Sequence, residues 1–224
     1  MPAAASTRKR RAPLSRERVL RTAVALADER GIEELTMRKL ARELGVEAMS
    51  LYNHVASKGD LLDGMIDLVF GEIEPPSLEL DWKTAMRRRA VSTREALNRH
   101  RWAVGQMEGR TTHGPANLRL HDAVLGCLRA AGFSIEMTVS AMSMQDAYIY
   151  GFALQETDMS SETADEFAAE AQRQMVAYQD VLADFPHLVD VVGGHVAKVG
   201  YDYDAEFLFG LDVILDGLDR LRGG

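Results

Sequence analysis

The chain has 224 residues, of which 46% are hydrophobic and 27% are charged. This composition is typical of a globular protein and argues against a disordered or fibrous one. No apolar run approaches the ~20 residues that span a bilayer, and the N-terminus lacks the apolar segment of a signal peptide. The single cysteine, Cys127, excludes an intramolecular disulfide and fits a reducing compartment. We therefore expect a cytoplasmic protein that does not associate with a membrane.

The net charge is −8, but it is unevenly distributed. Residues 1–60 hold 12 Lys and Arg against 8 Asp and Glu, a net charge of +4, whereas the rest holds 14 against 26, a net charge of −12. A basic N-terminal part beside an acidic remainder predicts that one end meets nucleic-acid phosphates. Four consecutive basic residues, Arg8 to Arg11, lie in residues 1–14, which we predict to be a disordered basic arm. This arm is either simply solvated or follows the DNA backbone.

Apolar residues recur at helical spacing along nearly the whole chain, without β-type alternation, so we expect an all-α fold. Ser15 is a good N-cap for a helix that ends at Gly31. Thr36 is a good N-cap for a shorter helix that ends at Gly45. Two further helices of the N-terminal part are expected at about 47–54 and 60–73.

The pair Pro75-Pro76 is the clearest boundary, because proline disfavours helix at the preceding residue and donates no hydrogen bond. It separates a three-helix helix-turn-helix domain and its following helix, residues 15–73, from a larger α-helical domain, residues 77–224. Helices of the larger domain are expected at about 81–98, 101–108, 115–131, 134–157, 162–184, 186–198 and 203–222.

The two short helices joined by Gly45-Val46 meet the requirements of a helix-turn-helix. Glycine permits the left-handed turn between them, and the helix over residues 16–30 braces the pair from behind. The second helix of the pair exposes Met49 and Asn53, four positions apart, on the side away from Leu51. Asparagine bonds adenine N6 and N7 together, and methionine packs on a thymine methyl group. This face therefore predicts contact with bases in a major groove, with simple packing as the alternative role for Met49.

Groups suited to phosphate oxygens surround that face. They comprise hydroxyl, imidazole and cationic side chains, and also the backbone amides at the start of a helix. For Tyr52 among them, a half-buried place in the core is the alternative. The predicted phosphate contacts are Thr36, Arg38, Ser50, Tyr52, His54 and Lys58.

The run from Leu35 to Leu62, LTMRKLARELGVEAMSLYNHVASKGDLL, resembles the DNA-binding domain of the TetR family of bacterial repressors. The resemblance implies that Ala48, Met49 and Asn53 lie where the family reads bases, and that the surrounding polar set holds phosphates. Because alanine offers little to a base edge, Met49 and Asn53 are expected to supply most of the readout. The shared patterns are A-x-x-L-G-V at 41–46, L-Y-x-H-[FV] at 51–55 and S-K-x-x-L-L at 57–62.

Residues 77–224 resemble, more weakly, the C-terminal domain of the tetracycline-repressor branch, most clearly from Trp82 to Glu156. This resemblance implies inducer binding and dimerisation. It also shows departures, since Met107 lies where the tetracycline sensor has a metal-linked histidine and Arg89 where it has a drug-binding asparagine. We therefore expect no metal and no other cofactor, and an inducer that is small, largely apolar and not a tetracycline–magnesium complex.

The helix at about 203–222 has an apolar face that is wider than one core stripe. This face would contact both the core and a partner chain, and the alternative is that one chain buries all of it. The resemblance implies that this helix pairs with the helix at 134–157, and we expect a homodimer interface through Leu208, Leu211, Leu215 and Leu218. Methionines and polar groups on the helices between 101 and 157 suit an adaptable ligand cavity, although a methionine stripe also suits a core. The candidate pocket residues are Met107, Asn117, His121, Met142, Gln145 and Tyr148.

These features predict a homodimeric repressor that binds a palindromic double-stranded DNA operator and is released by a small-molecule effector. The alternative is a helix-turn-helix regulator whose C-terminal domain docks a protein or activates transcription. An enzyme is not expected, because the six histidines lack metal-ligand spacing and no catalytic serine or cysteine motif occurs. In the repressor, the helix at 60–73 is expected to transmit the effector signal, with Gly64 allowing either a pivot or close packing.

Overall fold

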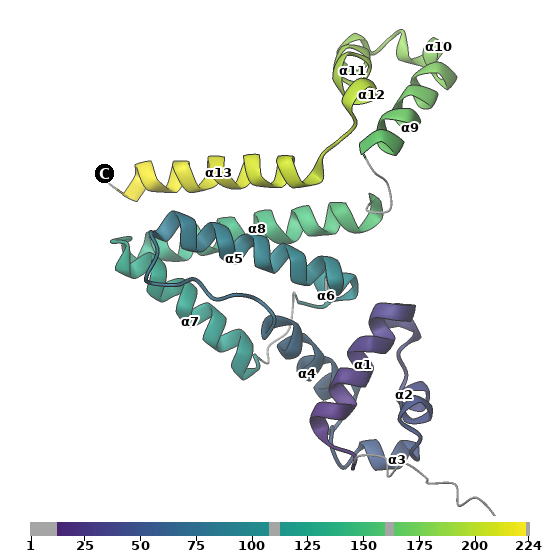
Figure 1. Ribbon diagram of the computed structural model, residues 1–224, viewed down its shortest axis with the longest axis vertical. Helices are drawn as coiled ribbons and strands as arrows, with labels where there is room; N and C mark the ends of the chain where they lie inside the picture. The colour runs from purple at the N-terminus through teal and green to yellow at the C-terminus, as the bar shows by residue number, and fades with distance from the viewer. Residues whose placement is uncertain (1–12, 108–112, 160–163, 223–224) are drawn as a thin grey trace, which may run out of the picture.

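The computed structural model describes residues 13–107, 113–159 and 164–222, and within these ranges the chain contains helices and no β-strand. The predicted all-α fold is confirmed. Figure 1 shows a small group of helices at one end, α1 to α3, which α4 joins to a larger group formed by α5 to α8 and α13. Residues 1–12 of the predicted basic arm lie outside the described residues. No helix in the described ranges is long and apolar enough to cross a membrane.

The N-terminal helices begin at the predicted capping residues. The hydroxyl of Ser15 accepts a hydrogen bond from the backbone N–H of Arg18 (3.2 Å), and the hydroxyl of Thr36 accepts one from that of Lys39 (3.2 Å). Gly45 ends its helix with φ +67°, a left-handed conformation that favours glycine. The elements are α1 (Arg16–Arg30), a 3₁₀ turn (Ile32–Glu34), α2 (Met37–Leu44), α3 (Ala48–Leu51) and α4 (Lys58–Phe70).

Helix α3 is shorter than the predicted span of 47–54. After Leu51 the chain continues in turns, in which the N–H of His54 bonds the carbonyl of Leu51 at 2.9 Å. This tighter winding returns the chain toward the core, where Leu51 and Val55 are both buried. Helix α3 is therefore a single helical turn, and buried Leu51 and Val55 hold it and the turn after it against the core.

Helix α4 packs closely on α1 at Gly64. A Cβ atom at this position would lie 2.7 Å from Cδ2 of Leu20, so a larger side chain would displace a buried leucine. This favours close packing over a pivot as the role of Gly64. Further along the same helix, Met65 and Val69 are fully buried, and α4 also contacts α6 and α7. Helix α4 is therefore part of the core of both groups of helices.

The larger group is organised around the long helix α8. The buried stripe of α8 repeats every three to four residues, and the helix packs against α5, α6, α7 and α13. Its buried residues include Ala141, Gln145 and Ile149. The elements of this group are α5 (Trp82–Arg99), α6 (Arg101–Met107), α7 (Pro115–Ala130), α8 (Ile135–Met159) and α13 (Tyr203–Arg222).

The segment between α8 and α13 differs from the two long helices predicted at 162–184 and 186–198. The first is interrupted at Tyr178, whose φ of −109° and ψ of 17° are not helical, and the second contains a π-helical stretch around Gly193-Gly194. Figure 1 shows this segment standing away from the rest of the molecule. Its elements are α9 (Ala164–Ala177), α10 (Gln179–Leu182), α11 (Pro186–Val191), the π-helical stretch (Val192–Val196) and α12 (Ala197–Val199).

Candidate DNA interface and effector region

The outward face of α3 presents the predicted base-reading side chains. Met49 is 74% exposed and Asn53 is exposed, whereas Ala48 is half-buried. The side chain of Asn53 makes no hydrogen bond within the described part of the chain, so both its amide groups are free for a base edge. Met49 on α3 and Asn53 in the turn that follows it are therefore exposed to solvent and contribute little to the core.

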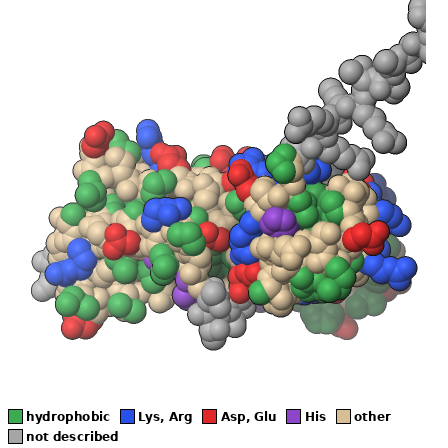
Figure 2. All heavy atoms as spheres, turned by 90° about the horizontal axis from the view of Figure 1, so that it is seen from below, with side chains coloured by type: hydrophobic (Ala, Val, Ile, Leu, Met, Phe, Trp, Pro, Cys, Tyr) green, Lys and Arg blue, Asp and Glu red, His purple; other side chains and the backbone are tan. Residues whose placement is uncertain are grey.

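The predicted phosphate contacts lie around this face, and most of them are exposed. Thr36 already accepts a capping hydrogen bond, and its hydroxyl proton remains available to donate. Among the described residues, Arg38 and Lys58 have no carboxylate partner, while Ser50 and His54 are half-buried. Tyr52 is 45% exposed, which excludes the core role considered for it. Figure 2 views the molecule from this end and shows several lysine and arginine side chains on it.

An ion pair that the sequence did not suggest holds the turn after α3 against α1. Arg16 donates to both carboxylate oxygens of Asp60, from Nη1 at 2.9 Å and from Nη2 at 2.6 Å. Nη1 of Arg16 also donates to the backbone carbonyl of His54 (2.9 Å), and Asp60 accepts from the N–H of Ala56 (2.7 Å). The hydrogen bonds from Arg16 are the main reason that the pKa of Asp60 is lowered. These bonds fix the chain between α3 and α4.

A second polar cluster joins the helix-turn-helix end to the larger group of helices. Asp28 on α1 accepts hydrogen bonds from Nε1 of Trp102 (2.7 Å) and from Nδ1 of His100 (2.8 Å). Nε2 of His100 lies 3.2 Å from Oε1 of Glu72, and Arg99 donates to Oε2 of Glu72 (2.9 Å). His100 and Trp102, which are 72 and 74 positions from Asp28 along the chain, thus anchor the far end of α1.

A third contact links α4 to α7. The Asp67 carboxylate accepts from the backbone N–H groups of Ala116 (2.9 Å) and Asn117 (3.0 Å), at the start of α7. A carboxylate in this position satisfies helix N–H groups that otherwise have no partner. Displacement of α4 therefore requires α7 either to move with it or to lose this cap.

Two of the predicted pocket residues use their polar groups within the fold. The hydroxyl of Tyr148 donates to the carbonyl of Phe207 (2.9 Å) and thereby ties α8 to α13, and burial raises the pKa of this phenol. Nδ1 of His121 contacts the carbonyl of Asn117 (2.9 Å) one turn earlier in the same helix. His121 therefore satisfies this ring nitrogen within its own helix. Met107 and Met142 are half-buried, and Gln145 is fully buried.

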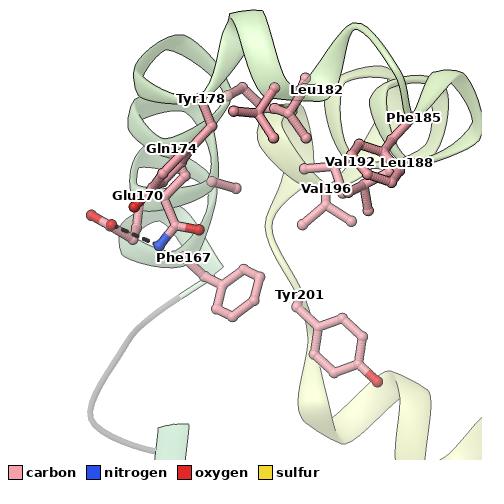
Figure 3. A pocket seen from close by; sticks show the side chains of 13 residues that line it. Phe167, Glu170, Gln174, Tyr178, Leu182, Phe185, Leu188, Val192, Val196 and Tyr201 are labelled. Atoms are coloured by element: carbon pink, nitrogen blue, oxygen red, sulfur yellow. Dashed lines mark hydrogen bonds between the residues drawn. The ribbon is translucent and has the colours of Figure 1, made fainter.

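A cavity of about 840 Å³ lies among α9 to α12, and none of the six predicted pocket residues lines it. Figure 3 shows its lining, which is mostly aliphatic and aromatic, with Phe167 and Tyr201 at one side. Its polar groups include Glu170 and Gln174, which bond each other at 3.0 Å. Of its lining residues, Tyr178, Val181 and Leu188 are also exposed, and Val176 and Val191 are exposed on the same segment outside the cavity.

Leu211, Leu215 and Leu218, which were predicted to contact a dimer partner, are buried within one chain. These side chains are at most 2% exposed within one chain, because α13 turns them toward α5 and α8. Leu208 is half-buried. A different face of α13 reaches the surface, with Phe209 71% exposed. The exposed apolar residues of α13 are Phe209, Val213 and Leu221, and those of α8 include Ile135, Val139 and Leu154.

The larger group also buries two arginines of α5 that sequence reasoning did not select as functional. Arg94 pairs with both oxygens of Glu156 and with Asp204, and these hydrogen bonds outweigh the effect of burial and raise the pKa of the guanidinium. Arg89 pairs with Asp146 at 2.6 Å. No cluster of three or more histidine, cysteine or carboxylate side chains that would suit a metal occurs in the described ranges. Cys127 is buried, which raises the pKa of its thiol.

Two family comparisons agree with this arrangement. Residues 19–65 match the family described as "Bacterial regulatory proteins, tetR family", and residues 75–222 match the "Tetracyclin repressor-like, C-terminal domain". The chain belongs to the TetR family. It is therefore a DNA-binding transcriptional repressor, and the expectation that it is not an enzyme is confirmed by its membership of a family of regulators.

Individual TetR-family relatives resemble the chain over most of its length. It is 35% identical over 215 residues to the HTH-type transcriptional repressor DrrR1 of Streptomyces coeruleorubidus, covering 93% of this chain and 78% of the relative. It is 30% identical over 207 residues to the tetracycline repressor protein class A from transposon 1721 of Escherichia coli, covering 91% and 90%. The crystal structure of the Streptomyces coelicolor TetR family protein ActR in complex with actinorhodin superposes with a TM-score of 0.79 at 29% identity, covering 95% and 100%.

Proposed function

We propose that the protein is a cytoplasmic homodimeric repressor that binds a palindromic operator and leaves it when a small, largely apolar effector binds. In this proposal residues 15–73 form the DNA-binding domain and residues 77–224 form the effector-binding and dimerisation domain. The observation that carries the proposal is the outward face of α3 and the turn after it, where exposed Met49 and unbonded Asn53 lie between free cationic side chains. Such a face combines base readout with phosphate positioning.

Met49 and Asn53 read bases in this proposal, and Ala48 adds only its methyl group. Lys58 and Arg38 pair with phosphates, and the hydroxyl and imidazole groups of Thr36, Ser50, Tyr52 and His54 add hydrogen bonds. The Arg16–Asp60 ion pair holds the chain after α3 in the conformation that presents these groups.

A second copy of the chain covers the exposed apolar faces of α8 and α13. These faces carry Phe209, Val213 and Val139, and apolar surface of this extent is unfavourable in water. The segment from α9 to α12 extends the same interface. Within one chain this segment contacts mainly itself, and its apolar side chains and its cavity stay open to solvent. A two-fold dimer places two copies of α3 about 34–36 Å apart, one turn of the DNA helix.

The effector binds within the larger domain, among α5 to α8. The solved ActR structure holds actinorhodin, which supports a small molecule over a docked protein as the signal for this chain. Effector binding must favour an arrangement of the two α3 helices that misfits the operator. Helix α4 connects the two domains and contacts α1, α6 and α7, so it is the element that transmits this change.

Selection of bound sequences from a random DNA pool tests the proposal with the purified full-length protein. The expected result is enrichment of an inverted repeat whose half-sites are one helical turn apart. Enrichment of a single unrepeated half-site would contradict the dimer, and failure to enrich any sequence would contradict operator binding itself.

A further inference from the structure

Two arginines of α5, five positions apart, are buried in different ways. Arg94 has an acceptor at each of its three nitrogens: Glu156 at Nε (2.9 Å) and at Nη2 (2.6 Å), and Asp204 at Nη1 (2.8 Å). Arg89 is 2% exposed and has one acceptor, Oδ1 of Asp146 at Nη2. Its Nε and Nη1 atoms, which carry three N–H bonds, have no acceptor among the residues that the structure describes.

The residue that precedes Asp146, the partner of Arg89, carries a buried acceptor without a hydrogen bond. Gln145 precedes Asp146 on α8 and is 0% exposed. Its Nε2 donates to the carbonyl of Ala141 (3.1 Å), but its Oε1 accepts from no group in the described ranges. The seam between α5 and α8 therefore contains unused donors on one helix and an unused acceptor on the other.

Buried polar atoms without partners destabilise a fold, so a bound group that supplies the missing partners stabilises it. A guanidinium is always charged and binds planar carboxylates more strongly than neutral acceptors. Arg94 shows how this chain satisfies such a group, with carboxylates from two different elements on one guanidinium. On Arg89 the protein supplies only one carboxylate, and Nε and Nη1, on opposite sides of the guanidinium, have no acceptor in the described ranges.

We infer that Arg89 and Gln145 form the polar end of the effector site and that the effector is an organic acid. Its carboxylate accepts from Nη1 of Arg89, as Asp204 accepts from Nη1 of Arg94, and a hydroxyl or N–H group of the effector donates to Oε1 of Gln145. Its apolar remainder packs among the apolar side chains of α5 to α8. This inference rests on the proposed effector-responsive repressor and adds the chemical class of the effector.

The test uses matched pairs of probes, 2-naphthoate and anthracene-2-carboxylate, each with its methyl ester. Binding to the full-length protein is measured by isothermal titration calorimetry and by the shift in melting temperature. At least one acid should bind the wild type and Arg87→Met, an exposed arginine of the same helix, and its ester should bind far more weakly. Arg89→Met should weaken binding of that acid about 30-fold or more.

Equal binding of an acid and its ester, unchanged binding to Arg89→Met, or no binding of either acid to the wild type would overturn the inference. A second measurement needs no ligand. Arg89→Met combined with Asp146→Asn should melt at or above the wild-type temperature, because it removes unsatisfied donors together with their charge partner. Arg94→Met should melt below it, because it leaves Glu156 buried without a partner. If both variants melt equally far below the wild type, Arg89 has only a structural role and the inference is wrong.

These outcomes are separate from the fate of the proposed repressor. If an ester binds as well as its acid and also releases operator DNA, the inference of an acidic effector is wrong. The protein is then still an effector-responsive repressor, but its effector is a neutral molecule. Loss of operator selection by the wild type counts against the repressor itself, whatever the acids do.

Discussion

The indole Nε1 of Trp102 donates a 2.7 Å hydrogen bond to the carboxylate of Asp28, although the two residues are 74 positions apart. Asp28 lies on α1 of the DNA-binding domain, and Trp102 lies on α6 of the effector domain. His100 donates to the same oxygen of Asp28, so a single carboxylate receives two groups from the other domain. A change in α6 on effector binding therefore acts directly on the helix that braces α3.

Asp28 and Trp102 should be energetically coupled. Trp102→Phe keeps an aromatic ring but removes the donor, so we expect the free energy of unfolding to fall by about 1 kcal/mol. In a double-mutant cycle with Asp28→Ala, the coupling energy should be about 0.5–1.5 kcal/mol. Urea unfolding followed by circular dichroism measures all four proteins. A coupling energy near zero would mean that the bond does not hold the two domains together.

The Arg16–Asp60 pair should make the DNA-binding domain sensitive to acid. The pKa of Asp60 is lowered mainly by its hydrogen bonds from Arg16, so the ionised carboxylate stabilises the folded state above the unfolded pKa of about 4. This stabilisation is lost as the pH falls below about 4, through the folded pKa. Because both side chains reach solvent, the loss should be about 0.5–1 kcal/mol.

Asp60→Asn should remove this part of the acid dependence, as judged from urea unfolding between about pH 3 and pH 7. Glu17→Gln is the matched control, because Glu17 pairs with Arg21 within α1 and holds no other element. If Asp60→Asn retained the full acid slope of the wild type, the pair would have no role in pH stability.

Lys58 should contribute to affinity without contributing to sequence choice. Lys58→Ala removes a phosphate contact, so binding should weaken similarly for all operator variants. The slope of log affinity against log salt concentration should fall by about 1. Fluorescence anisotropy at several salt concentrations measures this, with Lys198→Ala on α12 as a control that should leave the slope unchanged. A change in base preference caused by Lys58→Ala would argue against a purely phosphate contact.

The exposed face of α13 should hold the dimer together. Phe209→Glu places a charge where the second copy packs, so sedimentation velocity should show a shift from dimer to monomer at micromolar concentration. Leu78→Glu is the control, because Leu78 is as exposed as Phe209 but lies in the loop between α4 and α5. A Phe209→Glu protein that sediments as the wild-type dimer would place the interface elsewhere.

Local chemistry made the DNA-binding domain predictable from sequence. The caps at Ser15 and Thr36 and the left-handed turn at Gly45 are decided within four residues, and the i, i+4 spacing of Met49 and Asn53 was enough to place both on the exposed face. Capping and turn preferences of this kind are properties of short peptides.

Contacts between distant residues were not predictable in this way. Arg94 and Glu156 are 62 positions apart, and neither lies in a pattern that selects the other. Periodicity identified an apolar stripe on α13, but it did not show which helix covers which part, so Leu211, Leu215 and Leu218 were assigned to a partner although α13 buries them within the chain. The helix break at Tyr178 has no adjacent glycine or proline from which it could be predicted. The π-helical stretch, in contrast, contains Gly193-Gly194, from which an irregular helix could have been predicted.

The most direct test of α3 as the reading element is the base preference of Asn53→Ala. Binding of the wild type and of Asn53→Ala is compared on the selected operator and on all of its single-base variants, at one salt concentration. The variant should lose about 1–3 kcal/mol on the selected operator and should lose discrimination at one base pair per half-site, while the other positions keep theirs. Unchanged discrimination at every position would contradict the account, because a different surface would then read the DNA.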